Sequence, residues 1–130
     1  MGIKVARFGG TSLADAKAFQ RVRDIVLSDP ARRYVVPSAP GKRFPEDVKI
    51  TDMLYQCFKL AQRKESYLDV FDRIAERFKG ILQDLGLEDD LSPKLAETCQ
   101  MIATASPDYA ASRGEYFSGL ILSKYLGWDF

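Results

Sequence analysis

The residues best suited to chemistry lie near the N-terminus, in segment 7–12, which is Arg-Phe-Gly-Gly-Thr-Ser. This segment follows a short apolar stretch and precedes an amphipathic one, so it is predicted to join a strand to a helix. Such turns bind anions, because free N–H groups at a helix N-terminus and closely approaching glycines favour negative charge, and the Arg7 guanidinium adds to this. The segment therefore indicates a phosphate site, with a plain tight turn as the alternative interpretation.

Other common sources of chemistry are missing from the sequence. Segment 7–12 matches neither GxxxxGK[ST] nor GxGxxG, so neither of those phosphate cradles is implied. The chain has no histidine, which removes the commonest general base. Cys57 and Cys99 lack the spacing of a zinc site and are predicted to be reduced and buried, and no metal ligands are predicted. Any reaction must therefore depend on the placement of charge.

Three segments together resemble the aspartate kinases of the amino-acid kinase fold, whose opening strand and turn read Lys-Phe-Gly-Gly-Thr-Ser. Residues 35–41, Val-Val-Pro-Ser-Ala-Pro-Gly, lead to Thr51 and Asp52 and resemble the family's second strand and its serine and threonine substrate loop. Residues 112–115, Ser-Arg-Gly-Glu, resemble the family's Gly-Glu motif. The resemblance covers essentially all of residues 1–130, but only the first part of a family member.

The resemblance implies the N-terminal portion of a three-layer αβα, carbamate kinase-like fold with a parallel sheet core. It implies ATP-dependent phosphorylation of the L-aspartate β-carboxylate, with Mg²⁺ accompanying ATP, as the entry to lysine (diaminopimelate pathway), threonine and methionine biosynthesis. The subunits of such an enzyme could form a homodimer. The family's nucleotide-binding half, its later catalytic aspartate and its regulatory domains would lie beyond residue 130. We therefore expect residues 1–130 alone to be catalytically incomplete.

The resemblance also assigns roles to single residues. Arg7 takes the place of the charge-stabilising catalytic lysine. The residues that would bind the transferred phosphoryl group are Gly9, Gly10, Thr11 and Ser12. Those that would contact aspartate are Ser38, Thr51 and Glu115. These types suit the roles, because hydroxyls bond carboxylates, a glutamate pairs with an ammonium group, and phosphoryl transfer needs mainly positioning and charge neutralisation.

Each substrate contact has a structural alternative. Ser38 is also placed to end a strand, and Thr51 is placed to cap a helix. Ser112 and Glu115 have the spacing of a capping box, which would engage the Glu115 carboxylate without any substrate. The sequence leaves these alternatives open.

Two positions depart from the family pattern. Arg7 stands where the family has lysine, and a planar, forked guanidinium does not fit a compact ammonium site, so we expect weakened catalysis. Pro37 stands at the end of the second strand, where it is predicted to remove one hydrogen-bond donor from the sheet.

The elements that must position these residues begin with a βαβ unit. Strands are predicted over 3–8 and 33–36, joined by a helix that starts at Ser12 and ends near Ser28, so the strands should be parallel. Residues 38–50 form a long loop, of a kind that is often functional. Further helices are predicted from 51, from 66 to a stop at Gly86, from 92 to about 105, and from 112 to 125. Residues 128–130 resemble the start of a third strand, which leaves the sheet with exposed edge or apolar surface.

Composition narrows the remaining classes of function. The 19 basic and 18 acidic residues nearly cancel, and no run of like charge forms, so nucleic acids and anionic membranes are not expected as partners. No apolar run is long enough to cross a bilayer, and we expect a cytoplasmic chain that forms one domain. The main alternative to a kinase is a non-catalytic, kinase-like interaction module that docks through its unfinished sheet. A third is another member of the same fold, acting on glutamate, carbamate or a nucleotide.

Overall fold

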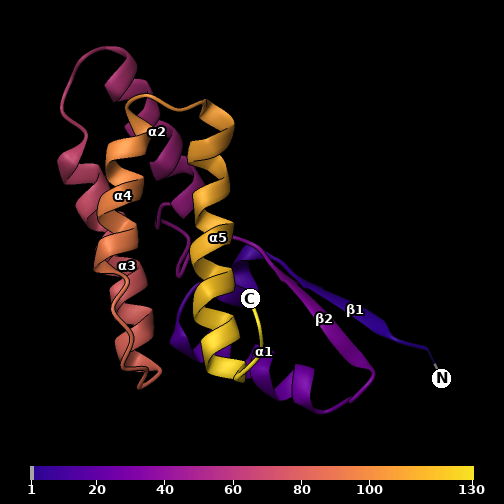
Figure 1. The fold of residues 1–130 in the computed structure, drawn as a ribbon. Helices are drawn as coiled ribbons and strands as arrows, with labels where there is room; N and C mark the ends of the chain where they lie inside the picture. The colour runs from indigo at the N-terminus through magenta and orange to yellow at the C-terminus, as the bar shows by residue number, and fades with distance from the viewer. Residues whose placement is uncertain (1) are drawn as a thin grey trace.

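The computed structural model describes residues 2–130. Figure 1 shows two strands extending to one side of a group of helices, with α1 near one end of that group. In chain order the elements are β1 (Lys4–Phe8), the 3₁₀ turn η1 (Gly10–Leu13), α1 (Ala16–Leu27), β2 (Arg32–Pro37), α2 (Ile50–Gln62), α3 (Leu68–Asp84), α4 (Ser92–Ile102) and α5 (Pro107–Leu126). Within the described residues, none of these helices has the length and apolar character needed to cross a membrane.

The two strands pair in parallel, which confirms the predicted βαβ unit. Val5 is in register with Tyr34, and partners in a ladder present their side chains on the same face. One face contributes Phe8 and Val35 to the helical core. The other face is open: Val5, Tyr34 and Val36 are 66%, 61% and 49% exposed. The expected exposed apolar surface is therefore present on this face of the sheet.

Pro37 does not weaken the pairing of β1 with β2. The carbonyl of Phe8 accepts its hydrogen bond from the N–H of Ser38, at 3.0 Å. In this parallel register the residue opposite Phe8 is Pro37, and its own nitrogen is directed away from β1. The prediction that Pro37 removes a donor from this ladder is therefore wrong.

The first helix begins later than predicted. The N-cap of α1 is Asp15, whose carboxylate oxygen Oδ1 accepts a hydrogen bond from the N–H of Ala18 at 2.9 Å. Ser12 instead lies in η1, where its N–H bonds to the carbonyl of Gly9 at 3.1 Å. The chain after β1 thus forms a short 3₁₀ turn before the α-helix, and Asp15 rather than Ser12 caps that helix.

The last helix begins earlier than predicted. Ser106 caps α5 by accepting a hydrogen bond from the N–H of Tyr109 at 3.1 Å, and Pro107 occupies the first helical position. Proline is favoured there because it has no N–H to leave unpaired. Ser112, the predicted start, therefore lies inside the helix.

The segment 128–130 forms no strand. The ring of Phe130 instead lies edge-on to the ring of Tyr116, with centroids 5.6 Å apart. It also covers Gly119, where an added Cβ would lie 2.8 Å from the Cε2 atom of Phe130. A strand requires a neighbour on the sheet, and Phe130 packs on α5 instead, so the predicted third strand is not formed here.

The hydrophobic core lies among the helices, around the fully buried rings of Phe19, Phe78 and Phe117. Phe78 of α3 and Phe117 of α5 have ring centroids 5.2 Å apart. Both cysteines are free thiols, Cys57 buried and Cys99 half-buried, which confirms the reduced state and, for Cys57, the burial. Burial raises the pKa of the Cys57 thiol to about 12, so it is a packing residue rather than a nucleophile.

One buried hydroxyl in this core gives a test of the packing. Ser118 is fully buried, and its Oγ has no hydrogen-bond partner among the described residues. Because an unpaired buried hydroxyl carries a desolvation penalty, we expect Ser118→Ala to leave the free energy of unfolding unchanged or raise it by up to about 1 kcal/mol. The measurement is urea unfolding of the purified chain. The control is Ser123→Ala, because Ser123 Oγ donates to the Leu120 carbonyl at 2.9 Å. A loss above about 1 kcal/mol for Ser118→Ala would contradict the packing.

Candidate active site

The loops that follow β1 and β2 are in direct backbone contact. The N–H of Gly41 donates to the carbonyl of Gly10 at 2.8 Å. A Cβ atom on Gly41 would lie 2.7 Å from the carbonyl carbon of Gly10, and one on Gly10 would lie 3.1 Å from the Ala39 carbonyl oxygen. Glycine is therefore required at position 41 for the loops to approach this closely, whereas a side chain at position 10 would fit only if its neighbours moved by a few tenths of an ångström.

The middle of α5 closes against the same place. A Cβ on Gly114 would lie 2.6 Å from the Cβ of Ala39 and 3.3 Å from Cγ2 of Ile50. The N–H of Ile50, at the start of α2, donates to the carbonyl of Pro40 at 3.3 Å. The glycine turn, the loop after β2, the start of α2 and α5 thus meet at the carboxyl ends of the strands, where open α/β sheets bind ligands.

Every predicted site residue belongs to this meeting point or is close to it in the chain. Ser38, Thr51 and Glu115 directly adjoin Ala39, Ile50 and Gly114, whose contacts are given above. Ser38 and Thr51 are half-buried and Glu115 is exposed. The structure therefore brings together the backbone positions of the three predicted aspartate contacts, and their roles stay predictions.

The residues predicted to bind the phosphoryl group, together with Arg7, are mostly exposed to solvent. Gly10 is half-buried, whereas the other predicted residues are exposed: Arg7, Gly9, Thr11 and Ser12. No atom lies within 4 Å of a Cβ built on Gly9, so the turn can be approached from solvent. Arg7 is in register with Val36 and lies on the open face of the sheet.

Two of the structural alternatives are wrong. The N-cap of α2 is Lys49, so Thr51 is the second helical residue and not the cap. The hydroxyl of Ser112 donates to the carbonyl of Tyr109 at 2.7 Å, from inside α5, so Ser112 and Glu115 do not form a capping box. The Glu115 carboxylate is therefore not used to cap this helix. Ser38 does follow the last residue of β2, so that alternative remains.

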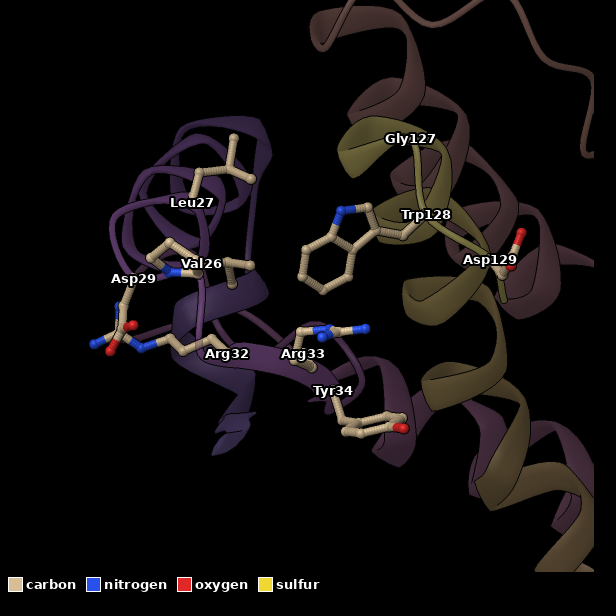
Figure 2. A pocket seen from close by; sticks show the side chains of 10 residues that line it. Val26, Leu27, Asp29, Arg32, Arg33, Tyr34, Gly127, Trp128 and Asp129 are labelled. Atoms are coloured by element: carbon tan, nitrogen blue, oxygen red, sulfur yellow. The ribbon is translucent and has the colours of Figure 1, made fainter. Parts of the chain in front are cut away.

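A large cavity lies elsewhere in the described chain. It measures about 700 Å³ and is lined by residues that include Val26, Arg33 and Trp128. Figure 2 shows the Trp128 indole pointing from the end of α5 towards Val26 on α1. This cavity adjoins the amino end of β2, whereas ligands of open α/β sheets bind at the carboxyl ends. We therefore place the candidate site at the contact between Gly10 and Gly41, and not in this cavity.

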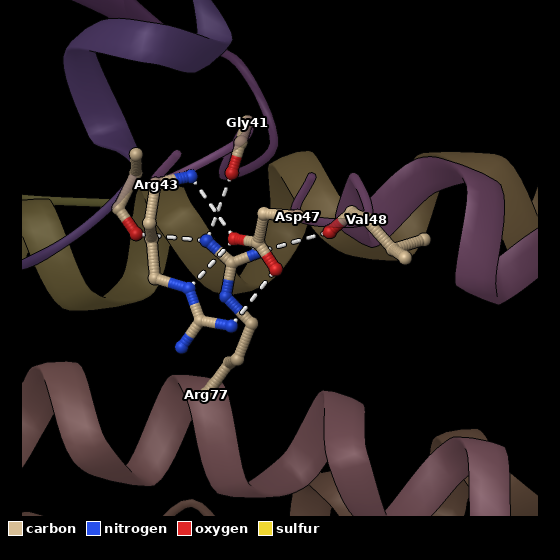
Figure 3. Close-up of polar contacts among 6 residues, drawn as sticks. Gly41, Arg43, Asp47, Val48 and Arg77 are labelled. Atoms are coloured by element: carbon tan, nitrogen blue, oxygen red, sulfur yellow. Dashed lines mark hydrogen bonds and ion pairs between the residues drawn. The ribbon is translucent and has the colours of Figure 1, made fainter. Parts of the chain in front are cut away.

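A buried arginine that the sequence analysis missed lies directly beneath the loops. Arg77 of α3 is only 8% exposed. Its Nη2 donates to the carbonyls of Ala14 and Gly41 at 2.8 and 2.9 Å, and its Nη1 donates to that of Val48 at 3.2 Å (Figure 3). The available signal was its place on the apolar stripe of α3, between Ile74 and Ile81, because an arginine there must be buried with partners.

A second arginine closes the loop after β2 on itself. Arg43 donates to the carboxylate of Asp47 through Nε at 2.7 Å and Nη2 at 2.9 Å, and the backbone N–H of Arg43 also donates to it at 2.9 Å. The Arg43 guanidinium therefore holds the pKa of the Asp47 carboxyl far below its usual range. Arg77 Nη1 lies 3.9 Å from the same carboxylate. Burial lowers the pKa of Arg77, with the nearby Arg43 charge as a smaller cause, yet a guanidinium remains protonated.

Residues 2–130 contain no cluster of three or more His, Cys, Asp or Glu side chains that could hold a metal ion. What the arrangement offers is a set of backbone groups, hydroxyls and charges around a tight glycine contact. That set can bind an anion and a small polar molecule side by side. Its chemistry would consist of positioning and charge neutralisation.

No protein-family model matches the chain, whereas curated proteins do. Aspartokinase 3 of Bacillus subtilis is 39% identical over 95 residues, covering 73% of this chain and 21% of that protein. The chloroplastic bifunctional aspartokinase/homoserine dehydrogenase 1 of Zea mays is 35% identical over 117 residues, covering 88% of this chain and 12% of that protein. The chain thus spans about a fifth, or less, of these two relatives.

The solved structures that this chain resembles are also aspartate kinases. The aspartate kinase of Clostridium acetobutylicum superposes with a TM-score of 0.94 at 45% identity, over 98% of this chain and 30% of that one. Aspartokinase III of E. coli, in complex with aspartate and ADP, superposes with a TM-score of 0.73 at 29% identity, over 96% of this chain and 29% of that one. The chain therefore corresponds to the N-terminal part of the aspartate kinases and has the matching portion of the amino-acid kinase fold.

Proposed function

We propose that residues 1–130 form the aspartate-binding part of an aspartate kinase. The enzyme would transfer the γ-phosphoryl group of ATP to the β-carboxylate of L-aspartate, and so begin the synthesis of lysine, threonine and methionine. A carboxylate oxygen forms the new bond to phosphorus, the bond to the β-phosphate oxygen breaks, and ADP leaves. The observation that carries the proposal is the meeting of Gly10, Ala39, Ile50 and Gly114, which sets all three resembling motifs around one point.

The proposed roles follow from charge and position. Glu115 is exposed and is not used in a capping box, so it can pair with the ammonium group of aspartate. Ser38 and Thr51 would donate their hydroxyls to its carboxylates. The turn at Gly9 and Gly10 would face the phosphoryl group that moves. The E. coli enzyme, whose structure this chain resembles, was solved with aspartate and ADP, and this supports the pairing of an amino acid with a nucleotide.

The described residues fit ATP on its phosphate side. The open approach to Gly9 suits an anion, and Arg7 adds a positive charge next to the turn. When bound, ATP supplies the phosphoryl group, and the chain's own residues place the carboxylate that receives it. Mg²⁺ enters the proposal as the companion of ATP, and no residue of this chain is assigned to it.

The experiment that tests the function uses the full-length product of the reading frame containing residues 1–130. Titration calorimetry measures L-aspartate binding, and a coupled assay measures ADP release with and without aspartate. Aspartate binding together with aspartate-dependent ADP release supports the proposal. A folded protein that shows neither would overturn it.

The open face of the sheet favours the second candidate, a non-catalytic interaction module. Val5, Tyr34 and Val36 leave an apolar strip uncovered, and large exposed apolar patches mark interaction surfaces. Sizing of the purified chain tests this candidate, since a module that docks on a second copy elutes as a dimer. A protease-resistant monomer would count against the module.

The Glu115 assignment predicts a specific loss of affinity. In the full-length protein, Glu115→Gln should raise KM for aspartate about tenfold to a hundredfold, because a hydrogen bond to a charged group contributes about 1.5–3 kcal/mol. Steady-state kinetics at saturating ATP measures it. The matched control is Glu97→Gln, an exposed glutamate on α4, which should leave KM unchanged. An unchanged KM for Glu115→Gln would remove Glu115 from the site.

Arg7 stands where the family has lysine, and this difference predicts that restoring lysine raises kcat. Arg7→Lys should increase kcat several-fold, because a compact ammonium group fits the position that the family occupies with lysine. The control is Arg33→Lys on the neighbouring strand β2, where no change is expected. Turnover is measured at saturating aspartate and ATP. Equal rates for Arg7→Lys and the parent protein would show that arginine serves equally well.

A further inference from the structure

Arg77 connects three segments that are far apart in the sequence. Ala14 lies between η1 and α1, Gly41 forms the close contact with Gly10, and Val48 lies just before α2. The guanidinium accepts no bond itself and donates to the carbonyl of each of these residues, at distances of 2.8–3.2 Å. Figure 3 shows it rising from α3 into the centre of the loop. One buried side chain therefore ties the turn after β1 to both ends of the loop after β2.

These attachments fix the parts of the site that the predicted substrate contacts depend on. Gly41 is held by Arg77 through its carbonyl and binds Gly10 through its N–H. Val48 lies two residues before Ile50, whose N–H closes the loop on Pro40. Displacement of Gly41 would thus move the turn at Gly9 and Gly10, which is predicted to bind phosphate. Displacement of Val48 would move Thr51. Arg77 itself makes none of the predicted substrate contacts.

The arrangement requires an arginine rather than any cation. The planar guanidinium has five N–H donors in a fixed fork, which lets it reach three carbonyls in different directions. A lysine ammonium on a flexible stem presents its donors from a single point and cannot span the same three. The charge is also costly to bury, and a well-packed apolar residue often stabilises a core equally well. A buried charge at this place therefore serves to hold one loop conformation.

We propose that Arg77 is a positioning residue for phosphoryl transfer, one that holds the glycine turn and the aspartate loop in register through the carbonyls of Ala14, Gly41 and Val48. This inference rests on the proposed function. It predicts that loss of the guanidinium changes how aspartate is bound and oriented, and does not only lower the amount of folded protein.

The kinetic test compares Arg77→Met, Arg77→Lys and the matched control Arg73→Met in the full-length protein. Arg73 lies one turn earlier on α3 and is exposed. We expect Arg77→Met to raise KM for aspartate and lower kcat, each by about tenfold or more, because small misplacements of reacting groups carry penalties up to about a hundredfold. Arg77→Lys should fall between Arg77→Met and the parent, and Arg73→Met should match the parent. KM does not depend on the fraction of folded enzyme, so a purely structural role leaves it unchanged.

A second measurement does not depend on activity. Amide hydrogen exchange, followed by mass spectrometry on peptides that cover residues 41–50, reports opening of the loop. Arg77→Met should speed exchange there by about tenfold or more relative to Arg73→Met, with peptides from α4 unchanged. If Arg77→Met does not fold, Arg77→Lys carries both measurements, with smaller changes in the same direction.

The outcomes distinguish failure of the proposed function from failure of the role given to Arg77. If the parent protein shows no aspartate-dependent ADP release but the loop opens in the Arg77 variants, the proposed function fails. What remains is the clamp, meaning the structural role of Arg77 in holding the carbonyls of Ala14, Gly41 and Val48. If the parent is active, an unchanged KM for aspartate in a folded Arg77→Met or Arg77→Lys protein overturns the positioning role. Exchange in residues 41–50 that is equal in the Arg77 and Arg73 variants overturns the clamp as well.

Discussion

The close contact between Gly10 and Gly41 is the constraint on which the rest of the site depends. Their backbones are joined by a hydrogen bond of 2.8 Å, and a Cβ on Gly41 would meet the carbonyl carbon of Gly10 at 2.7 Å. The loops after two parallel strands are thereby brought within reach of each other at one end of the sheet. Gly114 repeats the same device on α5, where only a residue without a side chain can approach Ala39. Small residues thus set the geometry, and in the proposed function charged residues nearby would supply the chemistry.

Charged residues near this contact form two groups. Arg7 and Glu115 are exposed, with opposite signs that would suit a phosphate and an ammonium group. The exposed Arg43, its partner Asp47 and the buried Arg77 hold the loop after β2 by bonds to carbonyl and carboxylate oxygens. The proposed reaction would need no histidine, because transfer of a phosphoryl group to a carboxylate requires alignment and neutralisation of charge rather than proton removal.

The sequence predicted the parallel βαβ unit, and its motifs predicted which segments should meet, because glycines, capping residues and apolar periodicity act locally. Helix starts were placed wrongly where two capping residues competed: Asp15 prevails over Ser12, and Ser106 over Ser112. Arg77 was missed because its partners are backbone carbonyls 29 to 63 positions away, and no local pattern records them. The segment 128–130 was predicted as a strand from composition alone, whereas strand formation depends on a neighbour.

The most direct measurement is a crystal structure of the full-length protein with L-aspartate and a non-hydrolysable ATP analogue bound. The account predicts the aspartate ammonium nitrogen within about 3 Å of the Glu115 carboxylate, and the γ-phosphate next to the turn at Gly9 and Gly10. Aspartate bound elsewhere, with Glu115 and Thr51 facing only solvent, would contradict it.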